Sequence, residues 1–219
     1  MKNHSEIFLL NGVGINLEKF KPVQKAEKDA LRSKYKYDSD DFIILYIAEF
    51  IVRKDHEFFI KNIPALKARI PNLKIIFAGR GQELKKMKIL SVNLEVDDII
   101  WFSGYRKDIA SLCQISDLYV TTSRQEGLPV SVIEAMATGL PVIASNIRGQ
   151  SDAVIPKRNG ELYELENSDD FLQMILMLYN NPELRDSMRK RNIEDSKKYS
   201  VDIAVQKMAG IYEGCLKIT

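Results

Sequence analysis

Apolar runs of strand length alternate with amphipathic stretches of helix length along most of this chain. The apolar runs are nearly continuous, as in FIILYIAE (Phe42–Glu49) and LKIIFAG (Leu73–Gly79). Continuous apolar strands are typical of a parallel sheet that helices cover on both faces. The pattern therefore predicts an α/β domain with a doubly wound, mostly parallel, Rossmann-like sheet and right-handed crossovers.

The first four predicted strands are each followed by a predicted helix, and beyond Ser168 only helices are expected. The predicted strands are Phe42–Glu49, Leu73–Gly79, Ile99–Gly104, Asp117–Thr122, Leu140–Ser145 and a short edge strand Gly160–Tyr163. The predicted helices are His56–Arg69, Gln82–Leu94, Lys107–Cys113, Pro129–Gly139 and the three C-terminal segments FLQMILMLYNN, PELRDSMRKRNIEDSKK and VDIAVQKMAGIYEGCL.

Two glutamates, Glu126 and Glu134, are separated by seven residues around the start of a short apolar helix. Pro129 opens this helix and Gly139 closes it, which is the usual punctuation of a helix. Glu126 falls on the loop at the carboxyl end of a strand, where α/β sheets bind ligands. Glu134 falls about one turn into the helix, where a buried carboxylate is costly unless something donates a hydrogen bond to it.

These features together favour a ligand that has both sugar hydroxyls and phosphates. Gly127 lets another molecule approach the backbone closely, and free N–H groups at a helix start suit a phosphate. Each carboxylate can accept hydrogen bonds from paired hydroxyls of a sugar or ribose. The spacing alone is more typical of glutamates on a solvated helix face, so the position between two strands carries the interpretation.

Composition excludes several other classes of protein. Charged residues make up 28% of the 219 residues and the net charge is +2, so no basic field on the scale of nucleic acid is indicated. The sequence has neither a signal peptide nor an apolar run long enough to span a bilayer. Cys113 and Cys215 lack the spacing of metal ligands and are expected to be reduced thiols of a cytosolic protein.

Several motifs stand in one order along the chain: NGVGINLEKFKP (Asn11–Pro22), FAGRGQEL, the stretch from Ile99 through EGLP, and NGELYE (Asn159–Glu164). In these motifs and their order, the chain resembles the donor-binding C-terminal domain of family 4, or group 1, glycosyltransferases. Those enzymes are retaining and have the GT-B fold. The resemblance covers nearly the whole chain, so the expected fold is one half of a GT-B enzyme.

The resemblance implies roles for residues at the carboxyl edge of the sheet. Lys54 would contact the donor diphosphate, where an ammonium neutralises charge that develops on the leaving group. Glu126 would accept hydrogen bonds from sugar hydroxyls, and Glu134 would hold the ribose. The other implied donor-binding groups are the backbone N–H groups of Gly127, Leu128 and Val130, together with Ser123 on the same loop.

One departure from the family pattern lies just after the first strand. The common Gly-Arg pair, whose arginine meets the diphosphate, is replaced by Ala48-Glu49. This replacement removes one cation from the phosphate site, and Glu49 could instead pair with Lys54 or Arg53. Arg53 either shares the phosphate role of Lys54 or is a surface cation.

Two further turns have competing interpretations. Gly79-Arg80-Gly81 is part of a dinucleotide fingerprint, but Leu84 stands where the third glycine is expected. We interpret it as a tight turn that lines the donor cleft, with Arg80 near phosphate. Tyr105-Arg106 resembles the segment whose backbone contacts the nucleobase, although Tyr105 could equally be a packed loop aromatic.

No metal or other cofactor is expected. Asp38-Ser39-Asp40 has the Asp-x-Asp spacing of metal-dependent glycosyltransferases, but it precedes the first strand and is interpreted as a solvated loop. His56 has no histidine partner at ligand spacing and is interpreted as a residue that begins a helix.

The resemblance also implies a division of the chain. Residues 1–22 would be the end of an N-terminal domain and the linker, 23–198 the donor-binding domain, and 199–219 a helix that packs on the absent domain. Such a chain should bind donor without transferring sugar. The apolar face of its last helix would then be exposed and favour dimerisation: Ile203, Met208, Ile211 and Tyr212.

The implied activity is transfer of a hexosyl unit from a UDP-sugar to a hydroxyl acceptor, in surface polysaccharide biosynthesis. The acceptor, a carbohydrate or a lipid-linked sugar, would be bound through the absent domain. No nucleic-acid partner is expected, and the implied location is the cytoplasm, with peripheral contact at the inner face of the membrane left open. Three alternatives remain: a non-catalytic nucleotide-sugar-binding module, a GT-B sugar-nucleotide epimerase and a Rossmann oxidoreductase.

Overall fold

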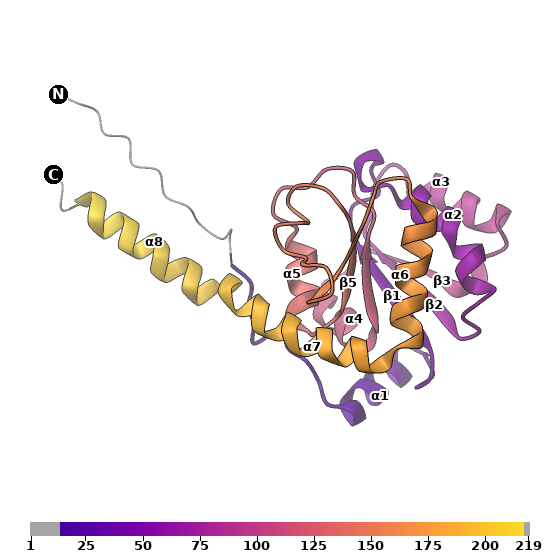
Figure 1. Ribbon diagram of the computed structural model, residues 1–219, viewed down its shortest axis with the longest axis horizontal. Helices are drawn as coiled ribbons and strands as arrows, with labels where there is room; N and C mark the ends of the chain where they lie inside the picture. The colour runs from indigo at the N-terminus through magenta and orange to yellow at the C-terminus, as the bar shows by residue number, and fades with distance from the viewer. Residues whose placement is uncertain (1–13, 217–219) are drawn as a thin grey trace.

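The computed structural model describes the backbone of residues 14–216 and the side chains of residues 14–214, in which six parallel strands form one sheet (Figure 1). The strand order is β3-β2-β1-β4-β5-β6, which is the order of a doubly wound Rossmann sheet and confirms the predicted fold class. The strands are β1 Phe42–Ile47, β2 Leu73–Ala78, β3 Ile100–Gly104, β4 Leu118–Thr121, β5 Val142–Ser145 and β6 Gly160–Tyr163. The order of the strands reverses between β1 and β4, so a crevice is expected at the carboxyl ends of these two strands.

Helices cover both faces of the sheet. Helices α2, α3 and α6 pack on one face, and α1, α4 and α5 pack on the other. The helices are α1 Lys25–Lys34, α2 His56–Lys67, α3 Leu84–Asn93, α4 Ile109–Ile115, α5 Val130–Ala137, α6 Ser168–Asn180, α7 Pro182–Ser196 and α8 Val201–Leu216; short 3₁₀ turns are η1 Val52–Lys54, η2 Asp97–Ile99 and η3 Lys197–Tyr199. The predicted elements all exist and differ from the observed ones by about two residues at their ends.

The continuous apolar strands have the predicted physical cause. In β1, Ile44 and Tyr46 face the layer of α2 and α6, whereas Ile43 and Leu45 face the layer of α4 and α5. All four side chains are essentially inaccessible to solvent. Because each strand contributes to two cores, no position along it can be polar without a buried partner.

Helix α1 is not among the helices predicted from the sequence. Its sequence, KAEKDALRSK, is rich in charge, and it docks through cations as well as through Leu31, which packs on the core. Arg32 and Lys28 contact the carboxylate of Asp117 at 2.6 Å and 2.7 Å, just before β4. The Ile43 amide of β1 also donates a hydrogen bond to the Asp117 carboxylate, at 2.9 Å. Asp117 therefore joins α1 to the amino ends of two central strands.

The described part of the linker motif packs against the body of the domain. Ile15 pairs with Ser200 through hydrogen bonds from the Ile15 amide to the Tyr199 carbonyl, 2.7 Å, and from the Val201 amide to the Ile15 carbonyl, 3.0 Å. Gly14 has a φ of +79°, and a Cβ there would lie 2.5 Å from Val201 Cα. The close approach of the two chain segments thus requires glycine at position 14.

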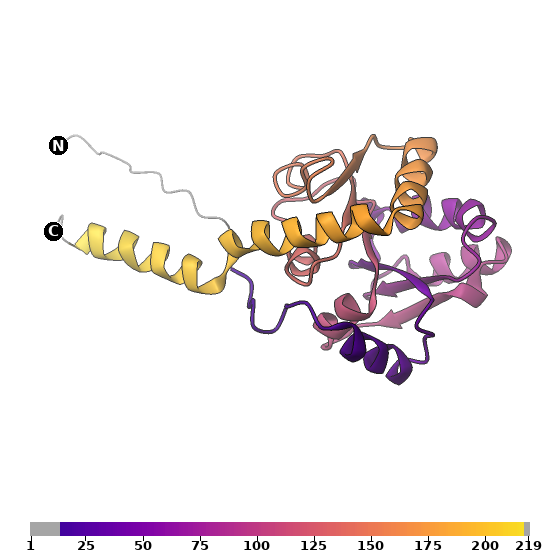
Figure 2. The same cartoon turned by 60° about the horizontal axis from the view of Figure 1, so that its bottom comes forward.

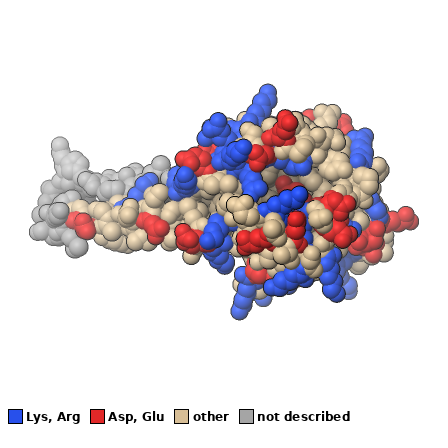
Figure 3. Space-filling model, turned by 90° about the horizontal axis from the view of Figure 1, so that it is seen from below, with Lys and Arg blue, Asp and Glu red and all other residues tan. Residues whose placement is uncertain are grey.

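Helix α8 extends away from the rest of the molecule (Figures 1 and 2). Met208 and Tyr212 are exposed on it, while Ile203 and Ile211 are partly covered. Lys, Arg, Asp and Glu side chains are interspersed over the face of the body shown in Figure 3, and α8 is less charged there. Among the described helices, none is long and apolar enough to cross a membrane.

Replacing Asp117 with asparagine should lower the free energy of unfolding by about 3 kcal/mol, because Arg32, which is almost fully buried, would lose its counter-charge. The matched control is Asp186→Asn, which breaks an exposed ion pair with Lys190 on α7 and should change stability by less than about 0.5 kcal/mol. Urea unfolding of the three proteins measures the difference. Equal stabilities for the two variants would show that Asp117 does not hold α1 to the sheet.

Candidate functional site: a cleft at the carboxyl ends of β1 and β4

The loops that follow β1 and β4 are tied together at the point where the strand order reverses. The Tyr46 hydroxyl donates to the Lys54 carbonyl at 2.5 Å, and the Thr122 hydroxyl contacts the Lys54 and Asp55 carbonyls at 3.1 Å and 2.8 Å. The Arg124 amide donates to the Arg53 carbonyl at 2.8 Å. The backbone around Lys54 is therefore fixed by residues of both central strands.

Arg124 adds a side-chain connection between the same loops. Its guanidinium contacts Asp55 at 2.7 Å and Glu166, after β6, at 2.9 Å. Asp55 has a left-handed φ of +48° and caps α2 by accepting a hydrogen bond from the Phe58 amide. Asp55 is not among the site residues predicted from the sequence. An aspartate directly before an amphipathic helix was the available signal.

Lys54 and Glu126 meet across these loops. The Lys54 ammonium forms an ion pair with Glu126, and the two side chains are only 15% and 12% exposed. Arg53, the neighbour of Lys54, is exposed and reaches only the Gln125 carbonyl, at 3.4 Å. Glu49 is also exposed, and the structure shows it paired with neither Lys54 nor Arg53 among the described residues. The alternative pairing considered for Glu49 is thus absent here.

The loop after β5 packs directly beneath Glu126 and Gly127. Gly149 has a φ of +90°, and a Cβ there would lie 2.0 Å from the Gly127 carbonyl oxygen. Only glycine fits at this approach, so the β5 loop sets the position of the β4 loop. Sequence reasoning missed this contact; a glycine a few residues beyond a buried strand was its one visible sign.

The other predicted residues of the β4 loop lie in different environments. Gly127 and Leu128 are exposed, and the Val130 amide already donates to the Leu128 carbonyl at 3.0 Å. Ser123 is fully buried, and its hydroxyl lies 3.3 Å from both Tyr46 and Thr121. The structure therefore places Ser123 beneath the loop rather than on the surface of the cleft.

Glu134 lies half-buried on α5, beside the linker and α4. Burial raises the pKa of its carboxyl to about 7, and the positive charge of Lys19 opposes this shift. No hydrogen bond to the Glu134 carboxyl is formed within the described part of the chain. The carboxyl is consequently available to a ligand that brings its own donors.

A cleft of about 530 Å³ lies at the ends of β1, β2 and β3. Arg80 lies over the ring of Tyr105 at 5.3 Å, and Tyr105 is 68% exposed, so it is not a packed loop aromatic. Arg106 is held by Asp108 in a two-pronged contact of 2.8 Å and 2.5 Å. A Cβ at Gly79 would lie 1.8 Å from the Ala48 carbonyl, which explains the first glycine of the Gly-Arg-Gly turn.

Several residues for which the sequence predicted no role in the site lie away from the cleft. Asp38-Ser39-Asp40 is an exposed turn before β1, at the opposite edge of the sheet from the cleft. His56 begins α2, stacked on Tyr46 and Phe50, and burial lowers the pKa of its imidazole to about 3. Cys113 is fully buried, which raises the pKa of its thiol; the side chain of Cys215 lies outside the described residues. Within residues 14–214, no group of His, Cys, Asp and Glu is arranged to hold a metal ion.

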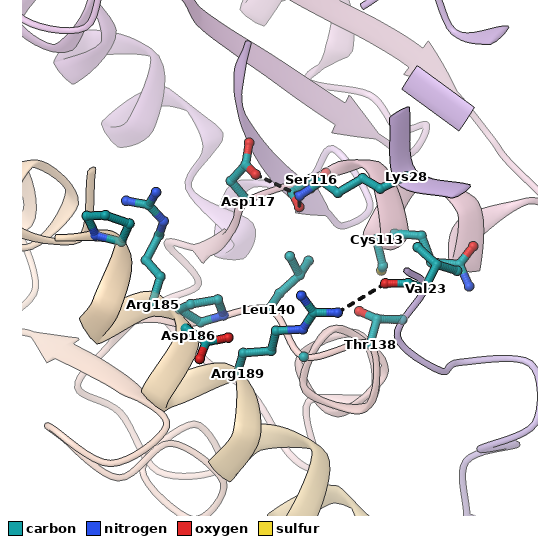
Figure 4. Close-up of a pocket in the computed structure, with 14 residues that line it drawn as sticks. Val23, Lys28, Cys113, Ser116, Asp117, Thr138, Leu140, Arg185, Asp186 and Arg189 are labelled. Atoms are coloured by element: carbon teal, nitrogen blue, oxygen red, sulfur yellow. Dashed lines mark hydrogen bonds and ion pairs between the residues drawn. The ribbon is translucent and has the colours of Figure 1, made fainter. Parts of the chain in front are cut away.

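A second cavity, of about 190 Å³, lies at the amino edge of the sheet (Figure 4). Lys28 points to the Ser116 carbonyl and Asp117, and Arg189 donates to the Val23 carbonyl at 3.1 Å. Arg185 donates to the Tyr179 carbonyl at 2.7 Å. These cations are used within the fold: Lys28 and Arg185 meet carbonyls at the carboxyl ends of α4 and α6, and Arg189 meets a carbonyl just before α1. We therefore assign them a structural role.

The sequence profile of the family described as "Glycosyl transferases group 1" matches residues 27–195. The chain belongs to the group 1 glycosyltransferases. It is 34% identical over 203 residues to the protein EpsD of Bacillus subtilis, covering 93% of this chain and 53% of that protein. In group 1 glycosyltransferases these motifs lie in the C-terminal domain, so this chain corresponds to that domain.

Two other similar proteins are informative. A Campylobacter jejuni protein named N,N'-diacetylbacillosaminyl-diphospho-undecaprenol alpha-1,3-N-acetylgalactosaminyltransferase is 28% identical over 97% of this chain and 56% of its own length. The crystal structure of S. aureus TarM with UDP superposes with a TM-score of 0.74 and 26% identity, over 78% of this chain and 35% of TarM. This glycosyltransferase chain thus spans about half the length of the curated relatives it matches.

Replacing Glu134 with glutamine should stabilise the chain more at high pH than at low pH. Because the folded-state pKa, about 7, lies above the ordinary value of 4.5, the neutral carboxyl is favoured by folding, and its contribution is lost as the pH rises through 7. Glutamine stays neutral throughout, so the melting temperature of the variant minus that of wild type should grow between about pH 5 and about pH 8.

Thermal unfolding across this range measures the difference. Glu213→Gln, on the exposed α8, is the control and should show no comparable trend. A pH-independent difference for Glu134→Gln would show that this carboxyl is not shifted by burial.

Proposed function

We propose that this chain is the donor-binding half of a retaining glycosyltransferase that uses a UDP-sugar. The observation that carries the proposal is the meeting of Lys54 and Glu126 at the carboxyl ends of β1 and β4, the strands between which the strand order reverses. An ammonium and a carboxylate suit a diphosphate and sugar hydroxyls respectively. The UDP bound to TarM, a protein with the same fold in this region, supports UDP as the nucleotide.

The donor would lie along the cleft in the following way. Tyr105 and Arg80 flank the cleft at β2 and β3, where they offer a ring face and a cation to the uridine end. Glu134 would accept hydrogen bonds from the ribose hydroxyls, which supply the donors that its half-buried carboxyl lacks. The diphosphate would then reach Lys54, and the sugar would reach Glu126. Ser123 would support the loop from beneath.

The chemical step is the departure of the sugar from its nucleoside diphosphate. Lys54 would stabilise the negative charge that develops on the leaving phosphate oxygen, because its backbone is held rigidly by Tyr46 and Thr122. Glu126 would orient the hexosyl unit through its hydroxyls. The bond between the anomeric carbon and the phosphate oxygen breaks, and the acceptor hydroxyl bonds to that carbon on the same face, so the anomeric configuration is retained. The proton of the hydroxyl passes to the leaving diphosphate.

The acceptor would be a carbohydrate or a lipid-linked sugar held by a second domain. The name of the Campylobacter relative specifies a diphospho-undecaprenol acceptor, which supports the lipid-linked class. Surface polysaccharide biosynthesis in the cytoplasm, at the inner face of the membrane, fits such an acceptor. The exposed apolar residues of α8, Met208 and Tyr212, would pack on that domain in the full-length enzyme.

A non-catalytic nucleotide-sugar-binding module and a sugar-nucleotide epimerase are two of the alternatives. A binding module would share the cleft, and turnover by the full-length enzyme separates it from a transferase. Against the epimerase, the one described histidine, His56, is buried and stacked away from the cleft. A transferase therefore remains the function that we propose.

Titration of this chain with UDP, GDP, ADP and NAD should show stabilisation by UDP, by about 2.7 kcal/mol at a concentration about 100 times the dissociation constant. Glu134→Ala should weaken UDP binding at least about tenfold, since two ribose hydrogen bonds to a carboxylate would be lost. Calorimetry and thermal shift measure both. Binding of NAD in place of UDP would overturn the proposal.

In the full-length enzyme, Lys54→Met should lower kcat by about 100- to 1,000-fold, because charge on the leaving diphosphate would be left without its cation. The neighbouring Arg53→Met is the matched control and should change kcat by less than about fivefold, since Arg53 is exposed. Steady-state kinetics provide kcat, and NMR of the product provides its anomeric configuration. Inversion would contradict the retaining mechanism.

A further inference from the structure

The ion pair between Lys54 and Glu126 occupies both halves of the site at once. The proposed function assigns Lys54 to the diphosphate and Glu126 to the sugar, yet without donor each side chain is the partner of the other. The two side chains cannot remain paired in this way while both contact the donor. Donor binding must therefore exchange one ion pair for two new sets of contacts.

Few other cations near the loop can take the place of Lys54. The Arg124 guanidinium is held by Asp55 and Glu166, and that of Arg106 is held by Asp108. Arg53 is exposed to solvent, which screens its charge. A diphosphate that enters the site must consequently compete with Glu126 for the ammonium of Lys54.

The cost of this competition depends on what happens to Glu126. Its side chain is only 12% exposed, so a carboxylate that loses Lys54 is poorly compensated by water. An intact donor brings sugar hydroxyls, which can donate hydrogen bonds to the freed carboxylate. UDP alone brings no such hydroxyls to this position, and the freed Glu126 also lies near its negative charge.

We propose that Glu126 is a competitor for Lys54 built into the site, which makes the cleft select the intact sugar nucleotide over free UDP. This inference rests on the proposed function and adds a specificity mechanism to it. Sugar recognition and diphosphate recognition are coupled. When the sugar hydroxyls bind Glu126, Lys54 becomes free for the diphosphate, and when the diphosphate binds Lys54, Glu126 becomes free for the sugar. After transfer, Glu126 recovers Lys54 and helps to displace the product nucleotide.

The test is calorimetric titration of this chain with UDP, UDP-glucose, UDP-galactose and UDP-N-acetylglucosamine. The variants are Glu126→Gln, Lys54→Met and the double variant, with thermal melts to show that each folds. Glu126→Gln should bind UDP about three- to tenfold more tightly than wild type, because Lys54 is free for the diphosphate. The preference of wild type for a sugar nucleotide over UDP should shrink in the same variant.

A matched control separates this mechanism from a simple loss of negative charge. Glu49→Gln removes a carboxylate that lines the cleft but does not pair with Lys54. If competition for Lys54 is the cause, the gain from Glu126→Gln disappears in the Lys54→Met background. Any gain from Glu49→Gln should be the same in both backgrounds.

Unchanged or weaker UDP binding by Glu126→Gln would overturn this inference, as would a gain that persists without Lys54. A wild type that binds none of the three sugar nucleotides more tightly than UDP would also contradict it. In each of these cases, UDP binding that Glu134→Ala weakens would leave the proposed function standing. Absence of UDP binding by wild type would overturn both.

Discussion

The geometry of the cleft depends on the hydrogen bonds that Tyr46 and Thr122 make with the backbone carbonyls of Lys54 and Asp55. Tyr46 belongs to β1, and Thr122 directly follows β4, so both are placed by the central pair of strands. Lys54 and Glu126, which are distant in sequence, are thereby held at a fixed separation. A loop tied to only one strand would leave the ammonium of Lys54 free to move relative to Glu126.

Electrostatics at the cleft is governed by burial as much as by the number of charges. Glu126 is paired with Lys54, whereas burial raises the pKa of Glu134, which has no such partner among the described residues, to about 7. A site for a polyanionic ligand can therefore contain carboxylates without a correspondingly negative potential. The linker contributes as well, since Lys19 is the cation that acts on Glu134.

The fold was predictable because its signal is local. Each strand is a continuous apolar run, and Pro129 and Gly139 mark the ends of α5 within their own segment. Helix α1 was not predicted because its segment is rich in charge, and the ion pairs with Asp117 that help to hold it come from a residue 85 positions away. A period in hydrophobicity cannot reveal such docking.

The candidate site was predictable only in part, for a related reason. The glutamate spacing pointed to the β4 loop, and the strand ends brought Lys54 to it. Ser123 is buried beneath the loop, and Gly149 supports Gly127; both are properties of contacts between segments that are far apart in the sequence. No feature of one segment determines them.

The pairing of Ile15 with Ser200 has a mechanical consequence. The segment that enters the domain and the helix that leaves it are hydrogen-bonded to each other at the surface of the sheet's helical layer. Two connections that share one point act as a single pivot. A rotation of α8 about Ser200 would carry Ile15 with it, and with Ile15 the linker residue Lys19 that faces Glu134. Movement at that pivot would thus change the electrostatic environment of the ribose end of the cleft.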